Sequence, residues 1–578
     1  MRRQSAREPR RVDGYAPIQD YAVIGDGETA ALVALDGSVD WLCLPCHDSD
    51  PAFAALLDAE AGGSFSLRPE EPFEAERRYV PESNVLETTF RTSGGAVRVT
   101  DAMTLDEGAV LPWRELVRRV EGLSGSVQMT WRAEGSQHRE SSSWSVLRWD
   151  AGEDGQFAIE AGGRALLALV DGDDGPCPRP TRDELEHRLD GTVEAWRRWV
   201  GSHTHEGPWP EAIERSLLAL KLLICSPTGA IVAAPTSSLP ERIGGERNWD
   251  YRYAWTRDSC WTIGSLIGLG FREQAHESLA WLLRAIRSTH PDVDPIYELD
   301  GSVLRRCDEL DWPGYRGSRP VRRGNGAGDQ LQLGGYGDLM DTAWAYVCEG
   351  NELDAGTGEL LAGVADNVCK KWRDADSGIW ELRDQQDYTQ SKVACWTALQ
   401  RAVDLAENGQ IREGDVDRWR ESIAEIEAFV EENCWSEERG SYLQFPGADK
   451  LDAAELLCSR RGYGDVNRDR VAATVDAIRR ELGRGALLYR YTGQDTEEGA
   501  FVACSFWLVE SLARLGRVDE AAELMEETLA FANDVGLYSE EIEPSTGDFL
   551  GNFPQGLSHL SLIRAAVAVQ ESSEGDGG

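Results

Sequence analysis

The amino-acid sequence predicts a protein of two parts, an N-terminal antiparallel β-sandwich followed by an all-helical toroid. Three observations predict this fold class. Short alternating apolar runs separated by turn residues fill the chain up to about Val170. From Pro210 onward, apolar residues recur at helical spacing instead. The chain has 578 residues, which is too long for one ordinary domain and suits two or three.

Two hairpins begin the β part of the chain. Asp36-Gly37 is a pair that favours a tight turn between antiparallel strands, and Ser93-Gly94-Gly95 is a second turn signal. The strands predicted around these turns are Thr29–Leu35, Ser38–Leu44, Glu87–Thr92 and Ala96–Thr100. More short alternating runs follow them, which is typical of an antiparallel β-sandwich.

A change in composition separates the two parts. Asp171–Arg182 is rich in Gly, Asp and Pro, and Asp183–Val200 after it has helical periodicity, so we expect a linking helix there. Both chain ends are polar and are expected to be disordered. The predicted bounds are 1–14 for the first tail, 15–180 for the β-sandwich domain, 181–209 for the linker helix, 210–571 for the helical domain and 572–578 for the second tail.

The helical part is a long series of periodic segments with no credible strand between them. The predicted helices are Glu211–Cys225, Arg257–Leu269, Arg272–Ser288, Tyr336–Glu349, Tyr388–Asn408, Asp415–Asn433, Ala500–Leu515, Val518–Asn533 and Gln555–Val569. Such a series predicts paired helices closed into a ring, an α-toroid. The long segment Asp292–Leu333 lacks this periodicity, and we expect it to lie at one end of the ring and to build the binding site.

The charge balance is strongly acidic. The formal net charge is −42, and the only lysines are Lys221, Lys370, Lys371, Lys392 and Lys450. An acidic surface repels phosphate backbones, so we expect no nucleic-acid partner. The composition fits a halophilic protein, which stays soluble in concentrated salt because the salt screens charge repulsion. GC-rich codon usage is the alternative explanation of the missing lysines, but it does not explain the excess of Asp and Glu.

The cysteines and the N-terminus predict a cytoplasmic protein. Twelve cysteines are scattered without regular spacing, which is typical of buried thiols in a reducing compartment. Cys43 and Cys46 have the spacing of a redox or metal pair, but no second pair lies nearby. Residues 1–11 lack the apolar core of a signal peptide, and no run is long enough to span a membrane. We therefore expect no membrane partner, cofactor or metal.

Five long segments carry a resemblance to one family of enzymes. They are Tyr15–Leu57, Asn248–Ser259 (NWDYRYAWTRDS), Gly314–Asp341, Gly378–Ala398 (GIWELRDQQDYTQSKVACWTA) and Leu537–Leu562 (LYSEEIEPSTGDFLGNFPQGLSHLSL). In content and order they resemble the bacterial and archaeal members of glycoside hydrolase family 15, which contains glucoamylases, related α-glucosidases and trehalases. Because the five segments are spread in order along nearly the whole chain, from Tyr15 to Leu562, the resemblance is far more specific than one short motif. It implies an (α/α)6 barrel behind an N-terminal β-sandwich.

The resemblance also implies an inverting hydrolase with two glutamates in fixed roles. Glu381 matches the family's general acid and Glu540 matches its general base. Hydrolysis needs one protonated carboxyl group for the leaving oxygen and one ionised group for the attacking water. Ile379 and Trp380 give apolar cover that would raise the pKa of Glu381 and keep it protonated. Glu541 adjoins Glu540, so the choice of base between the two stays open. The alternative for any single glutamate is a solvated surface residue without a catalytic role.

Further residues match sugar-binding positions of the family. Arg257 and Asp258 match the clamp on the terminal glucose, since a carboxylate accepts hydrogen bonds from hydroxyl groups and arginine offers a planar fork of donors. The alternative is a buried ion pair at a helix start. Arg319 and Arg322 match arginines of the substrate loop, with a salt bridge at the loop base as the alternative. The other expected substrate contacts are Trp249, Trp255, Trp312, Trp380 and Glu541, although core packing is the commoner use of tryptophan.

The implied function is the exo-acting release of β-glucose from an α-linked glucoside. Maltooligosaccharide or glucan ends come first as substrates and α,α-trehalose second. Two other classes stay open, an inverting phosphorylase and a sugar-binding protein without catalysis. A phosphorylase needs a phosphate pocket in place of the base, and a binding protein needs neither glutamate. The presence of both Glu381 and Glu540 disfavours these two classes, while the oligomeric state is left open.

Overall fold

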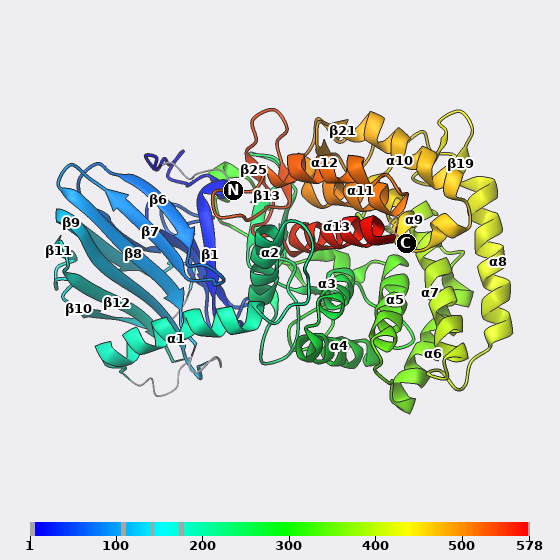
Figure 1. Ribbon diagram of the computed structural model, residues 1–578, viewed down its shortest axis with the longest axis horizontal. Coiled ribbons are helices and arrows are strands. Elements are labelled where there is room, and N and C mark those ends of the chain that lie inside the picture. The colour runs from blue at the N-terminus through cyan, green and yellow to red at the C-terminus, as the bar shows by residue number, and fades with distance from the viewer. Residues whose placement is uncertain (1–5, 106–110, 140–143, 173–178, 576–578) are drawn as a thin grey trace.

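The computed structural model describes residues 6–105, 111–139, 144–172 and 179–575. Strands gather at one end of the elongated molecule and helices fill the rest, and the long helix α1 (Arg182–Val200) lies along the strands (Figure 1). The arrangement confirms the predicted antiparallel β domain followed by a helical toroid.

The β part is one sheet in which neighbouring strands run antiparallel. Its main path is β1-β2-β3-β5-β9-β8-β7-β6, and the remaining strands pair at the sides. The strands are β1 (Tyr21–Gly25), β2 (Ala30–Ala34), β3 (Ser38–Cys43), β4 (Pro51–Phe53), β5 (Ser64–Pro69), β6 (Glu74–Tyr79), β7 (Leu86–Arg91), β8 (Gly95–Met103), β9 (Arg114–Glu134), β10 (Trp144–Trp149), β11 (Gln156–Glu160) and β12 (Arg164–Asp171). Both predicted hairpins are present, as the pairs β2–β3 and β7–β8.

The 21-residue strand β9 belongs to both halves of this sheet. Its first half pairs with β8 and β12, and its second half pairs with β5 and β11. Between the halves, Gly125 has a φ of 64°, and a Cβ there would lie 2.0 Å from the carbonyl oxygen of Gly94. Only glycine fits such a close approach. The two predicted layers are therefore joined through one bent strand rather than formed by separate sheets.

The chain ends are more ordered than the sequence predicts. Arg7 pairs with Ala75 through backbone hydrogen bonds, and Arg11 donates to Asp36 at 2.7 Å. At the other end, α13 (Gly556–Gly575) continues beyond the predicted boundary at residue 571. Arg7 and Arg11 thus bind residues of the β part that lie far from them in sequence, and the local composition of the N-terminal segment cannot reveal such contacts. Residues 1–5 and 576–578 of the predicted tails lie outside the described residues.

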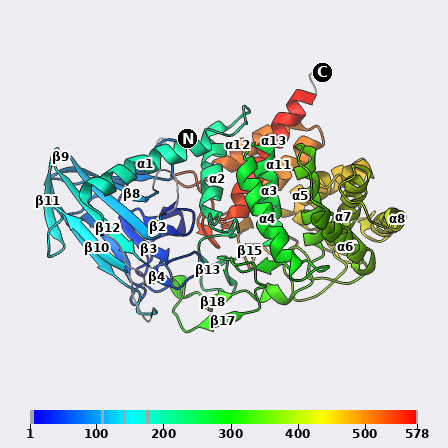
Figure 2. The same cartoon turned by 90° about the horizontal axis from the view of Figure 1, so that it is seen from below.

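Helices α2 to α13 form the toroid in two layers (Figures 1 and 2). In the inner ring, α3, α5, α7, α9, α11 and α13 each pack against the next, and α13 packs against α3 to close the ring. The even-numbered helices lie outside it. The bounds are α2 (Pro210–Leu223), α3 (Thr256–Gly268), α4 (Arg272–Arg287), α5 (Gly334–Cys348), α6 (Ala355–Lys371), α7 (Thr389–Glu407), α8 (Val416–Asn433), α9 (Leu457–Arg460), α10 (Arg468–Leu482), α11 (Val502–Arg514) and α12 (Val518–Leu529).

Buried polar contacts join the β part to the ring. Trp41 Nε1 donates a hydrogen bond to the carbonyl oxygen of Pro235 at 2.8 Å. Arg252 donates to the carbonyl oxygen of Ser49 at 2.8 Å, and its guanidinium carbon lies 5.8 Å from the centre of the Trp41 ring. Arg252 belongs to the NWDYRYAW stretch, so the interface between the two parts lies directly behind a segment expected to carry the site.

Two further expectations concern the whole described chain. None of its helices is both long and apolar enough to cross a membrane. Eight of its cysteines are buried, namely Cys43, Cys225, Cys260, Cys369, Cys395, Cys434, Cys458 and Cys504, whereas Cys307 and Cys348 are exposed.

Candidate active site

One end of the helical ring carries a cavity of about 660 Å³. The N-terminal ends of α3, α11 and α13 reach this cavity, together with the turn before α7. The segment Asp292–Leu333 supplies Cys307, Glu309, Arg322 and Gln330 to the wall. Three of these residues lie on the hairpin of β17 (Cys307–Leu310) and β18 (Val321–Gly324). Segments far apart in sequence therefore meet at one concave site.

Glu381 lines the cavity from the turn between α6 and α7. Its backbone φ is 59°, a left-handed conformation that is uncommon for a residue with a side chain and that needs support from its surroundings. Gln330 Nε2 donates to the Glu381 carbonyl oxygen at 3.0 Å, and Trp255 Nε1 donates to its Oε1 at 2.6 Å. Burial raises the pKa of Glu381, while the positive charge of Arg257 opposes the rise.

Glu540 lines the same cavity from a small three-stranded sheet. It directly precedes β24 (Glu541–Ile542), which pairs with β23 (Ala500–Phe501) and β25 (Phe549–Leu550). The Tyr251 hydroxyl donates to Glu540 Oε1 at 2.6 Å. A Cβ at Gly551 would lie 2.4 Å from Glu540 Oε2, so glycine makes room for the carboxyl group. Burial, followed by the negative charge of Glu241, raises the pKa of Glu540 to about 8.

One aromatic pair connects the two glutamates. Tyr251, the partner of Glu540, and Trp255, the partner of Glu381, pack edge to face with ring centroids 5.2 Å apart. Both rings come from the NWDYRYAW stretch, so a single short segment fixes the positions of both carboxyl groups. Sequence alone predicts the two glutamates at one site, and the shared support of the two is visible only in three dimensions.

Arg257 and Asp258 lie in the first turn of α3 and line the cavity. Arg257 Nε donates to Asp258 Oδ2 at 3.1 Å, and Arg257 Nη1 donates to the carbonyl oxygen of Ile379 at 2.9 Å. The pair is therefore an ion pair at a helix start and also a part of the cavity wall. The bond to Ile379 ties α3 to the turn that carries Glu381.

Three of the four predicted tryptophans line the cavity, namely Trp249, Trp255 and Trp380. Trp249 Nε1 donates to Glu241 at 3.0 Å, and Trp380 Nε1 donates to Asp452 at 2.8 Å. Because both indole nitrogens are held by carboxylates, the ring planes are fixed.

Trp312, the fourth predicted tryptophan, is not among the residues that line the cavity. It is buried beside the β part, where its ring stacks on His138 with centroids 4.2 Å apart. The loop that carries it turns away from the ring of helices toward the strands. Packing between the two parts of the molecule, rather than contact with a ligand, accounts for this tryptophan.

The two predicted loop arginines lie in different surroundings. Arg322 lies on β18, lines the cavity and stacks on the Trp249 ring at 4.4 Å. Arg319 is absent from the cavity wall: its side chain is 59% exposed and its Nη1 lies 3.7 Å from Asp311. The reason is the hairpin, because Arg319 falls in the loop that joins the strands, whereas Arg322 falls on the strand face that turns inward.

Glu541, also predicted as a substrate contact, is not among the residues that line the cavity. Successive residues of a strand point to opposite faces, so Glu541 points away from the site that Glu540 faces. Its Oε2 accepts from the Gly499 backbone N–H at 2.9 Å. It is fully buried beside Arg490, which pairs with Glu241 at 3.0 Å and with Glu498. Glu541 is thus part of a buried charge network behind the site.

Several lining residues were not singled out from the sequence. Tyr251 lies inside the NWDYRYAW stretch, and a donor to the expected base could have been sought there. Arg490 and Tyr491 come from a short loop whose local pattern gives no functional signal. The lining residues missed in this way include Arg247, Tyr251, Arg490, Tyr491 and Trp507.

Comparisons with known proteins agree with this geometry. The model of the glycosyl hydrolases family 15 matches residues 208–567, and the model of a trehalase-like N-terminal domain matches residues 11–139. A trehalase of Mycolicibacterium smegmatis is 35% identical, over 98% of this chain and 93% of its own. A trehalase of Thermoplasma volcanium is 34% identical, over 97% of this chain and 95% of its own.

Solved structures show the same fold. A bacterial glucoamylase complexed with acarbose superimposes with a TM-score of 0.68 at 12% identity, over 98% of this chain and 97% of the other. At this identity the match concerns the fold, which is an antiparallel sheet joined to a helical toroid.

Proposed function

Because this chain belongs to the glycosyl hydrolases of family 15, we propose that it hydrolyses α,α-trehalose with inversion at the attacked carbon. Glu381 acts as the general acid and Glu540 as the general base. The choice of trehalose rests on relatives named trehalase that match at 34–35% identity over nearly the full chain. The order of the two substrates predicted from sequence is therefore reversed.

One observation carries the proposed chemistry: Glu381 and Glu540 face one cavity and are held by the two members of one aromatic pair. Inverting hydrolysis needs two carboxyl groups on opposite sides of the bond that breaks, with room for a water molecule between the base and the sugar. The cavity of about 660 Å³ lies in the range that encloses a ligand of disaccharide size.

In the proposed step, Glu381 gives its proton to the glycosidic oxygen as the bond from that oxygen to the sugar C1 breaks. A water oxygen attacks C1 from the opposite face, and its proton passes to Glu540. Glu381 ends ionised and Glu540 ends protonated, and proton exchange with solvent restores both. Arg257 and Asp258 hold the hydroxyl groups of the reacting glucose, so that C1 faces the water.

The protonation states follow from the surroundings. Burial raises the pKa of Glu381, which keeps the acid protonated. Burial and Glu241 raise the pKa of Glu540 to about 8, so the ionised base gains population as the pH approaches that value. The rate should therefore rise with pH on the acid side of the profile, and fall once Glu381 loses its proton.

Maltooligosaccharides remain the second candidate substrate. In this proposal Arg257 and Asp258 bind one terminal glucose, and such binding does not specify the linkage to the next sugar. The deciding experiment is a panel of trehalose, maltose, isomaltose, maltooligosaccharides and soluble starch, with and without phosphate. We expect trehalose to have the highest kcat/KM and glucose as the only product. Faster maltooligosaccharide cleavage would favour the second candidate, and a phosphate-dependent sugar phosphate would indicate a phosphorylase.

The anomers released from trehalose test the inverting mechanism. Inversion at one C1 gives β-glucose, while the departing glucose keeps its α configuration, so early product should contain the two anomers in equal amounts. Proton NMR before mutarotation measures the ratio. Early product that is α-glucose alone would indicate retention and would remove the proposed roles.

A further inference from the structure

A second cavity, of about 270 Å³, lies at the opposite end of the ring from the candidate active site. The same inner helices reach both sites. The first turns of α3 and α13 line the larger cavity, whereas Cys260–Gly268 of α3 and Ile563–Glu571 of α13 line the smaller one. Trp261 and Trp507 stand between the two, with ring centroids 5.8 Å apart. The second cavity is thus separate from the sugar site, and the proposed function makes no use of it.

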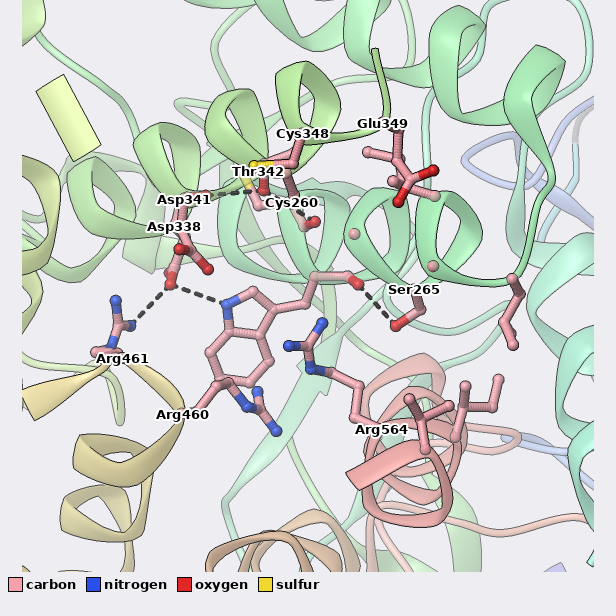
Figure 3. A pocket seen from close by; sticks show the side chains of 18 of the residues that line it. Cys260, Ser265, Asp338, Asp341, Thr342, Cys348, Glu349, Arg460, Arg461 and Arg564 are labelled. Carbon is pink, nitrogen blue, oxygen red and sulfur yellow. Dashed lines mark hydrogen bonds and ion pairs between the residues drawn. The ribbon is translucent and has the colours of Figure 1, made fainter. Parts of the chain in front are cut away.

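Arginines dominate the inner wall of this second cavity. Arg460, Arg461, Arg514 and Arg564 line it, and Figure 3 shows Arg460 and Arg461 on one side with Arg564 opposite them. Arg461 is neutralised by Asp338 at 2.7 Å. The other three converge on a single carboxylate, Glu510, which is 2% exposed.

One carboxylate cannot balance three guanidinium groups. Arg460 donates from both Nε and Nη2 to one oxygen of Glu510, Oε2, and Arg514 donates to Glu510 Oε1 at 2.9 Å. Arg564 approaches Glu510 only to 4.0 Å and has no hydrogen-bond partner among the described residues for its buried Nε. Arg460 Nη1 and Arg461 Nε are also buried without a hydrogen-bond partner there. Unpaired N–H groups in a buried site are costly unless a ligand or water accepts from them.

Helix ends explain two of the arginines but not the third. Arg460 and Arg514 lie in the last turns of α9 and α11, where positive charge interacts favourably with the helix dipole. Arg564 lies in the middle of α13, where no helix end accounts for it. The pKa of Arg460 is lowered to about 10, because burial lowers it, Glu510 opposes the fall, and the nearby Arg564 and Arg514 add to it. Positive charge is thus gathered on the inner wall around Glu510.

The acidic residues of the cavity act mainly on the other arginines and not on Arg564. Asp341 is paired with Arg401 at 2.8 Å. The pKa of Arg514 is raised, because burial, which lowers it, is outweighed by the negative charges of Glu510, Glu571 and Asp341. Among the described residues, Arg564 has no ion pair closer than the 4.0 Å contact with Glu510.

We propose that this second cavity is a binding site for a small oxyanion, held by Arg564 and Arg460 against the wall formed by Trp261. A guanidinium fork is suited to two oxygens of such an anion. The Arg460 guanidinium carbon lies 4.6 Å from the centre of the Trp261 ring, so its plane is already fixed before an anion arrives.

The test is thermal unfolding of the full chain in millimolar sulfate, phosphate or acetate, with chloride added to hold the ionic strength constant. We expect Tm to rise with the anion concentration above the dissociation constant, by about 2 °C at a hundredfold excess over that constant. A rise in acetate as well would mean that a planar carboxylate fits, whereas a rise in sulfate or phosphate alone would specify a tetrahedral anion, and each supports the site. The rise should persist with excess glucose, which excludes binding at the arginines of the sugar cavity.

Arg564→Gln should abolish the anion-dependent rise in Tm, and Arg420→Gln, on the outer helix α8, should retain it as the matched control. In chloride alone, Arg564→Gln should keep or raise the Tm, because it relieves repulsion among the three arginines. An unchanged anion response in Arg564→Gln, or no response above chloride in the parent chain, would mean that the cavity holds water only. A Tm several degrees lower for Arg564→Gln in chloride would make this arginine a structural partner of Glu510 and overturn the proposal. None of these readouts depends on trehalose hydrolysis.

Discussion

Adjacent glutamates with different surroundings define the chemistry at the scale of single residues. Glu540 faces the cavity and accepts from Tyr251, whereas Glu541 is turned into the network of Arg490. Both side chains are buried, so burial alone does not distinguish a catalytic glutamate from a structural one. The direction of each side chain relative to the cavity is the basis of the proposed role of Glu540.

Replacement of either proposed catalytic glutamate by Gln should reduce kcat at least about 10²-fold, because each supplies a proton transfer that water replaces poorly. Glu541→Gln is the matched control. The pKa of Glu541 is raised well above its ordinary value by burial, so its uncharged isostere should keep most of the activity. Steady-state kinetics on trehalose, with far-UV circular dichroism as a check of folding, measures this. An active Glu540→Gln beside an inactive Glu541→Gln would exchange the two assignments.

The charge of Glu241 should set the acid limb of the pH profile. Its negative charge raises the pKa of Glu540, and the base works only when ionised. Removal of that charge in Glu241→Gln should lower the pKa of Glu540, so kcat/KM should reach its plateau at a lower pH than in the parent enzyme. Glu498→Gln removes a charge from the same network and should shift the limb less. If Glu241→Gln and Glu498→Gln shifted the acid limb of the pH profile equally, the pKa of Glu540 would depend on the total charge of this network rather than on Glu241 in particular.

Sequence patterns identify the reacting groups more readily than their supports. The segments around Glu381 and Glu540 are distinctive in themselves. Arg490 and Glu498 have no such local signal, because their significance comes from meeting Glu241 across long sequence separations. The positions of Trp312 and Arg319 outside the cavity have the same origin, since a loop residue's distance from a matched motif does not tell which way the loop folds.

At the scale of elements, the β24–β25 hairpin sets the position of Glu540. Gly551 and Gly547 both lie in this region with positive φ, of 69° and 78°. A Cβ at Gly551 would meet Glu540, but a Cβ at Gly547 would meet no atom within 4 Å. Substitution at Gly547 therefore adds backbone strain alone, whereas substitution at Gly551 adds backbone strain and also displaces the proposed base, Glu540.

Gly551→Ala should lower kcat by about 10²-fold, because displacement of a catalytic group by about 1 Å costs that much. Gly547→Ala carries a similar backbone penalty, of about 1 kcal/mol, and should leave kcat near the parent value. Kinetics and thermal unfolding of both variants provide the comparison. Equal kcat values for the two would show that Glu540 tolerates crowding at Gly551.

Helix prediction succeeded where the apolar stripe was wide and failed where tertiary packing overrides local preference. In α6, three glycines lower the helix propensity, yet Gly358 is required because a Cβ there would lie 2.5 Å from the carbonyl oxygen of Gln410. The four-residue helix α9 is too short to give a period. The ring itself was predicted from the number of helices, and its closure depends on such short and irregular members.

At the scale of the whole molecule, the net charge of −42 is the dominant feature. Many arginines form ion pairs at partly exposed positions, where each pair contributes little to stability. The remaining carboxylates repel one another over distances that depend on salt, because the Debye length grows from ~3 Å at 1 M to ~30 Å at 0.01 M.

Stability and activity should therefore rise with NaCl or KCl into the molar range, since counterions screen this repulsion. Thermal unfolding at graded salt, with trehalose hydrolysis measured alongside, tests the expectation. Full stability and activity in dilute buffer would contradict it and leave codon usage as the explanation of the five lysines.

The contact of Arg252 with Ser49 has a consequence for modularity. Arg252 is flanked by Tyr251, which holds Glu540, and lies three residues before Trp255, which holds Glu381. The strands therefore serve as scaffolding for the catalytic segment rather than as a detachable accessory domain. A truncation at the linker helix would therefore remove the contacts that support Arg252 from the helical domain. A shortened or recombined enzyme should keep both domains together with the interface between them.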